Sequence, residues 1–133
     1  MNTLARICWI TAPIYALIGM AYGIHMATTS NFALAPAHAH LNLLGWVTIA
    51  LYGVFYTVVP AAASSMLAKI HVALAEIGVI IIVPGIALAV TGQGEALAAI
   101  GSIVTILSML LFLIVVVRAT SRAKAVIGVK QPA

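Results

Sequence analysis

Charged side chains are scarce in this sequence of 133 residues: Lys and Arg number six and Asp and Glu two, together 6% of the chain. A soluble domain carries about 25% charged residues. Apolar residues make up 65% and the mean hydropathy is +1.24, so the chain has too few polar groups to cover its surface in water. We therefore expect an integral membrane protein whose solvent is the lipid bilayer, with no nucleic-acid partner.

Cysteine is nearly absent as well. The single Cys8 excludes an intrachain disulfide and a cysteine-rich metal site. Carboxylates, which calcium and magnesium prefer as ligands, are limited to two. Four histidines remain as candidate ligands, and neutral imidazole in an apolar setting suits haem iron or copper.

Four long apolar runs are present, each close to the roughly 20 residues that a helix needs to cross a bilayer. Open strands would leave backbone groups unpaired in lipid, so we predict helices. Pro36 is well placed as the first residue of a helix, and Pro84 should kink its helix without ending it. The sequence predicts an all-α, single-domain membrane four-helix bundle over residues 1–133, with helices at about 7–26, 37–59, 70–90 and 96–117 and a basic C-terminal tail at 118–133.

The basic residues predict an orientation, because all six fall on one side if the chain spans the membrane four times. They are Arg6, Lys69, Arg118, Arg122, Lys124 and Lys130. The positive-inside rule then places both termini in the cytoplasm, and we expect a multi-pass protein of the bacterial inner membrane. In that orientation His71 lies near the inner face. The other three histidines lie near the outer face: His25, His38 and His40.

Small residues recur at helical spacing in three of the runs. Such residues let helices approach closely in lipid, so we interpret them as packing seams. They are Ala12, Ala16, Gly19 and Gly23 in the first run, Ala75, Gly78 and Gly85 in the third, and Gly101, Thr105 and Ser108 in the fourth.

The second run begins with two histidines spaced by two. At about 100° per residue, His40 lies about 200° from His38, on the opposite side of one helix. The His38 side also carries Asn42, Gly45, Ile49, Tyr52 and Tyr56. The His40 side also carries Leu44, Val47 and Leu51. Both sides should therefore meet protein or cofactor, which fits an oligomer in which this helix lines a seam between subunits.

The segment HAHLNLLGWVTIALYG, residues 38–53, resembles helix two of the catalytic subunit of haem-copper oxidases, especially the cbb3-type oxidases and nitric oxide reductases. In that family a His-x-Asn supplies a ligand to low-spin haem b, and His40-Leu41-Asn42 matches this pattern. The resemblance implies haem b as cofactor and His38 and His40 as its ligands. Asn42 and Gly45 would lie beside the haem, with Trp46 and Tyr52 as aromatic walls.

The resemblance also implies an architecture. The oxidase core consists of three four-helix arcs around a pseudo-threefold axis, so this chain would be one arc and a homotrimer would mimic one oxidase subunit. His38 of one protomer could then approach His40 of the next across a haem. A competing arrangement holds the haem within one protomer, between His25 and either His38 or His40. The chain has no adjacent His-His pair and no His-Tyr element of the type found around the oxidase copper.

The function expected from these residues is electron transfer or binding of a diatomic gas such as oxygen or nitric oxide, with a quinol or a cytochrome as redox partner. Two axial histidines favour electron transfer, and one favours gas binding. Any enzymatic activity would be that of a haem-dependent oxidoreductase. One alternative is an outer copper-binding or transport site made of His25, His38 and His40. Another is a structural subunit of a respiratory complex, without a cofactor.

Glu76 is the one acidic residue inside a predicted span. It could be a carboxyl that is neutral or hydrogen-bonded to a neighbouring helix. Alternatively, Glu76 and His71 could take part in a proton relay, as intramembrane acids often do. The two lie about 140° apart on one helix, so a direct pair between them is not expected.

Overall fold

The structure, a computed structural model, describes the backbone of residues 1–129 and the side chains of residues 1–121. Every regular element in this part of the chain is helical. In chain order the elements are α1 (Thr3–Thr29), α2 (Ala35–His40), the π-helix η1 (Leu41–Thr48), α3 (Ile49–Val58), α4 (Pro60–Ala63), α5 (Met66–Val90) and α6 (Ala96–Val129). Because α2, η1 and α3 follow one another without a break, we call them together helix two (Ala35–Val58).

Four helices of the described residues are long and apolar enough to cross a membrane, which confirms the predicted all-helical, four-span chain. They are Thr3–Thr29, Ala35–Val58, Met66–Val90 and Ala96–Ser121. Many bulky apolar side chains point outward, Ile103 and Leu17 among them, as expected where lipid is the solvent.

The boundaries differ from the prediction at both ends of the chain. α1 begins at Thr3 rather than near residue 7, because the Asn2 side chain accepts a hydrogen bond from the Ala5 N–H at 2.9 Å and caps the helix. α6 continues to Val129, so most of the stretch predicted as a tail is helical. Lys130 and the three residues after it lie outside the described residues. Pro84 lies inside α5 without ending it, as predicted.

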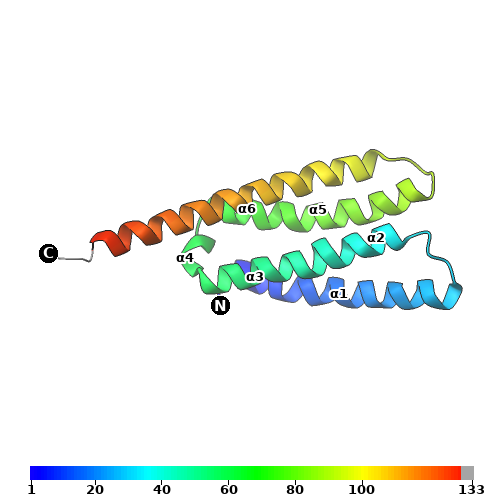
Figure 1. Cartoon of the computed structure of the whole chain (residues 1–133), viewed down its shortest axis with the longest axis horizontal. Helices are drawn as coiled ribbons and strands as arrows, with labels where there is room; N and C mark the ends of the chain where they lie inside the picture. The colour runs from blue at the N-terminus through cyan, green and yellow to red at the C-terminus, as the bar shows by residue number, and fades with distance from the viewer. Residues whose placement is uncertain (130–133) are drawn as a thin grey trace.

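The helices form two hairpins that lie side by side (Figure 1). α1 packs along helix two, α5 packs along α6, and helix two also contacts α5, which joins the hairpins. The start of α1 and the end of α6 lie at one end of the molecule (Figure 1). We call it the basic end, after Arg6, Lys69 and Arg118. The opposite end carries the loops at residues 30–34 and 91–95, and we call it the histidine end, after His25, His38 and His40.

α5 and α6 approach each other along small residues. A Cβ added at Gly85 would lie 2.5 Å from the backbone nitrogen of Ala98, and one added at Gly101 would lie 2.6 Å from Cα of Ile82. At both places the two backbones are in contact, so only glycine fits. The predicted seam is confirmed here, since its buried members include Ala75, Gly78, Gly85, Gly101 and Ser108.

Helix two changes its winding just after His40, where the π-helix η1 begins. The Thr48 hydroxyl donates to the carbonyl of Leu43, five residues earlier, at 2.8 Å. On an α-helix, positions four apart drift by about 40° around the axis, and the wider π turn offsets that drift. The buried positions of helix two accordingly include a series spaced by four: Ala37, Leu41, Gly45, Ile49 and Gly53.

Candidate functional site

His38 lies on the side of helix two that packs against α1. A Cβ added at Gly23 would lie 3.1 Å from its Cε1, and the Tyr22 ring centroid lies 6.4 Å from that of the imidazole. One turn further on, the Asn42 amide nitrogen donates to the His38 carbonyl at 2.9 Å and lies 3.4 Å from Nε2. The His38 ring is therefore half-buried in the first hairpin.

His40 points to a different side of helix two and is exposed. Its Nδ1 lies 2.8 Å from the carbonyl oxygen of Pro36, one turn earlier. Because a carbonyl only accepts, Nδ1 must carry the hydrogen, and Nε2 keeps a free lone pair. Metal-binding histidines usually have this arrangement, in which the second ring nitrogen donates to a carbonyl or carboxylate and fixes the tautomer.

A groove of about 380 Å³ opens beside His40, between helix two and the second hairpin. It is lined by Ala39, His40, Leu43, Leu44, Ile82, Ser102, Thr105 and Ile106. Both hydroxyls in it donate within α6, that of Ser102 to the Ala98 carbonyl and that of Thr105 to the Gly101 carbonyl, each at 2.8 Å. The groove is therefore mostly apolar, with His40 among its lining residues, and its volume is in the range of ligand sites.

Other residues predicted to surround a haem do not line this groove. Asn42 contacts α1 at Gly19, where an added Cβ would lie 2.6 Å from Oδ1. Gly45 is buried against the Tyr15 ring, and Tyr52 is buried against the ring of His71. Trp46 is exposed but is not part of the groove wall. The expected aromatic walls therefore serve packing within one chain or face outward, because helix two turns these side chains away from His40.

His25 is exposed near the end of α1, and its carbonyl accepts hydrogen bonds from the hydroxyls of Thr28 and Thr29. Within the described residues, no three side chains of His, Cys, Asp or Glu come close enough together to hold a metal ion. His25, His38 and His40 therefore do not form the three-histidine copper site considered from the sequence.

His71 lies in the half of α5 nearer the basic end and has no exposed surface. Its Nδ1 lies 2.9 Å from the Tyr56 hydroxyl, while Nε2 is buried without a hydrogen-bond partner in the described part of the chain. Aromatic rings enclose it, with centroid distances of 4.4 Å to Tyr52 and 5.0 Å to Phe112. The sequence placed Tyr52 and Tyr56 on one face of helix two, but no local pattern could have brought Phe112 from α6 to this cluster.

Glu76 is bonded to α1 and not to His71. Its Oε1 lies 2.7 Å from the Thr11 hydroxyl oxygen, and its Oε2 accepts from the Tyr15 hydroxyl at 2.8 Å. His71 is bonded to Tyr56 instead, so no direct pair forms, in agreement with the angular spacing. The contact with a neighbouring helix is one of the two possibilities raised by the sequence.

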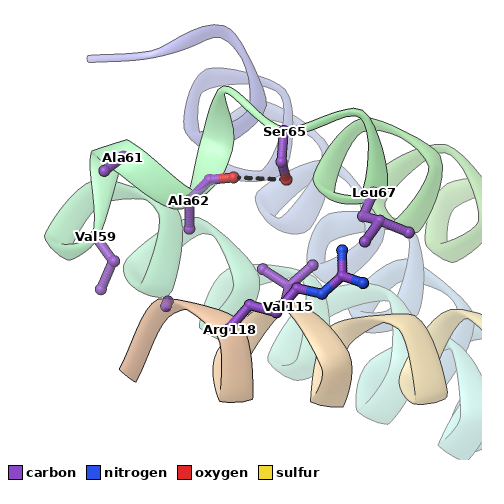
Figure 2. A pocket seen from close by; sticks show the side chains of 8 residues that line it. Val59, Ala61, Ala62, Ser65, Leu67, Val115 and Arg118 are labelled. Atoms are coloured by element: carbon purple, nitrogen blue, oxygen red, sulfur yellow. Dashed lines mark hydrogen bonds between the residues drawn. The ribbon is translucent and has the colours of Figure 1, made fainter. Parts of the chain in front are cut away.

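A second cavity, of about 130 Å³, lies at the basic end (Figure 2). Its lining comes from the turn around α4 and from α5 and α6: Val59, Ala61, Ala62, Ser65, Leu67, Val115, Arg118 and Ala119. Figure 2 shows the Arg118 guanidinium beside Leu67 and Val115. The lining contains no histidine and no carboxylate, so this cavity is not part of the candidate site.

Comparison of the chain with protein-family models, with curated proteins and with solved structures finds no match. The resemblance to the haem-copper oxidases therefore rests on the residues of helix two alone. The candidate site is accordingly argued from its own geometry, with His40 and the groove at its centre.

Proposed function

We propose that this chain binds haem b at the histidine end, where His40 would be a ligand to its iron. The observation that carries the proposal is the hydrogen bond from Nδ1 of His40 to the Pro36 carbonyl, which in the neutral ring leaves the Nε2 lone pair free in a residue that lines an apolar groove. Imidazole ligation next to apolar walls is what a b-type haem requires. When bound, the haem supplies one-electron chemistry or, with an open iron position, binding of a diatomic gas.

The residues of the chain would have separate tasks in such a site. Pro36 orients the imidazole, and Leu43, Leu44 and Ile82 exclude water from the groove. Neither His38 nor His25 lines the groove, so a second histidine ligand would come from another copy of the chain. This arrangement favours a homotrimer in which each subunit is one arc of an oxidase-like core, since a ring of heterologous interfaces closes on itself.

The membrane setting of the proposal follows the basic residues. Arg6, Lys69 and Arg118 lie at one end, and by the positive-inside rule we propose that both termini lie in the cytoplasm of a bacterium and that the groove lies in the outer half of the inner membrane. The redox partner would then be a quinol in the membrane or a cytochrome on its outer side.

The test is the visible spectrum of the full-length protein purified in detergent. Sharp, split absorption bands of the reduced protein would indicate two histidine ligands. A broad absorption band that shifts when carbon monoxide is added would indicate an open iron position. A colourless protein, with or without bound copper, would refute the haem proposal. Native mass spectrometry of the same sample tests the assembly, and a monomer that retains haem would refute the trimer.

A matched pair of variants tests the groove. Ser102→Phe places a ring in the groove and should lower the haem content several-fold. Ile103→Phe adds a ring at the next residue of α6, which is 60% exposed and outside the groove, and should leave the haem content unchanged. Equal haem content in both variants would place the haem elsewhere.

A further inference from the structure

The carboxyl of Glu76 lies within a membrane-spanning helix and makes its contacts with α1. Each of its oxygens is within hydrogen-bond distance of one hydroxyl, that of Thr11 or that of Tyr15. Among the side chains that the structure describes, no Lys, Arg or His forms an ion pair with it. An ionised carboxylate without a neighbouring cation is costly at this depth. The question is therefore whether Glu76 is ionised or protonated.

The number of hydrogens shared by Glu76, Thr11 and Tyr15 favours the protonated form. The Thr11 hydroxyl has a single hydrogen, but three oxygens lie close to it: Oε1 of Glu76 at 2.7 Å, the Ile7 carbonyl at 3.0 Å and the Cys8 carbonyl at 3.5 Å. If Glu76 is ionised, all three are acceptors, and a hydrogen donated to Glu76 is lost to the two carbonyls of α1. If Oε1 carries a hydrogen, it donates to Thr11, Thr11 donates to Ile7, and Tyr15 donates to Oε2. In the protonated form each carboxyl oxygen of Glu76 therefore has its own hydrogen bond, and the Thr11 hydrogen is left for the carbonyls of α1.

We propose that Glu76, Thr11 and Tyr15 form a proton-binding site inside the membrane, in which Glu76 takes up and releases a proton. The ligand is the proton itself, and the two hydroxyls of α1 hold the acid in place. The titratable groups that face Glu76 are Tyr15 and Cys8, both from α1. This site is separate from the His40 groove and replaces the suggested relay through His71, because His71 is bonded to Tyr56.

Infrared spectroscopy of the purified chain tests the proposal, because it requires no access of a reagent to the site. The difference spectrum between wild type and Glu76→Gln at neutral pH should contain one carbonyl band of a protonated carboxyl. The chain has only one other acidic side chain, Glu95, which is exposed before α6, and wild type minus Glu95→Gln should contain carboxylate bands and no acid band beside the amide bands of the new Gln. Carboxylate bands without an acid band for Glu76 would overturn the proposal.

Release of the proton is tested by raising the pH. The acid band of Glu76 should be replaced by carboxylate bands, and in Tyr15→Phe it should persist to higher pH, because the lost hydrogen bond stabilises a carboxylate more than an acid. If the acid band of Glu76 stayed unchanged over the whole pH range in which the protein is folded, the proposal that Glu76 takes up and releases a proton would be overturned. His40→Ala should retain the acid band, so failure of the haem proposal and failure of this one can be distinguished.

Discussion

His40 and His71 are two histidines with the same internal arrangement in opposite surroundings. In each, Nδ1 is engaged by an oxygen at 2.8 or 2.9 Å, and Nε2 has no hydrogen-bond partner among the side chains and backbone that the structure describes. His40 is exposed beside a groove of about 380 Å³, whereas His71 has no exposed surface and is enclosed by the rings of Tyr52 and Phe112. A free ring nitrogen is therefore not sufficient for a ligand site, since space beside that nitrogen is needed as well.

The oxygens that engage the two rings also differ. The Pro36 carbonyl can only accept, so it fixes the hydrogen of His40 on Nδ1. The Tyr56 hydroxyl can donate or accept, so it leaves both tautomers of His71 open. In the proposed function His40 would bind the haem iron through Nε2, while His71 links α5 to helix two. The comparison predicts that substitutions at His71 alter stability and that substitutions at His40 alter cofactor binding.

The largest effect on stability is expected for His71→Ala. It removes a fully buried ring, opens a cavity between α5, α6 and helix two, and leaves the Tyr56 hydroxyl without its partner. Buried large-to-small substitutions cost about 2–5 kcal/mol, and we expect a loss in that range. Thermal unfolding in detergent, followed by circular dichroism, measures it against His25→Ala as the exposed control. Equal stability of both variants would contradict the role of His71 in packing.

Gly101→Ala should have a smaller effect, of about 1–3 kcal/mol, because the new methyl group would overpack the contact between two backbones. A Cβ at this position lies 2.6 Å from Cα of Ile82. The same unfolding experiment measures the loss, with Ile103→Ala as a control on the exposed side of α6. If Gly101→Ala were as stable as this control, α5 and α6 would not pack as described.

Tyr56→Phe sharpens the comparison further. It keeps the ring but removes the hydroxyl, so both nitrogens of His71 become unpaired in the core. An unsatisfied buried polar group costs about 1–3 kcal/mol, and we expect the lower part of this range because the ring still fills its space. If His71→Phe restored the stability of Tyr56→Phe in the double variant, the loss would be assigned to the unpaired imidazole. No recovery would assign it to other contacts of Tyr56.

The smallest effect on stability is expected for His40→Ala. The side chain is exposed and bonds only to a carbonyl of its own helix, so the free energy of unfolding without cofactor should change by no more than about 0.5 kcal/mol. A loss comparable to that of His71→Ala would show that His40 has a structural role, and the contrast between the two residues would fail.

The sequence was sufficient to predict the four spans, the small-residue seam of α5 and α6, and the different sides of helix two to which His38 and His40 point. These features depend on periodicity within one segment. The groove beside His40 was not predictable, because Ile82, Ser102 and Thr105 come from the other hairpin. The same holds for Phe112 against His71 and for the two hydroxyls at Glu76, since each contact depends on how separate helices pack.

The most direct measurement of the central claim is the haem content per chain of His40→Ala and His71→Phe, both purified in detergent beside the wild type. We predict that the wild type binds haem, that His40→Ala loses it while remaining folded, and that the folded fraction of His71→Phe retains it. Full haem content in His40→Ala, together with loss in folded His71→Phe, would contradict the account and would place the ligand in the buried cluster.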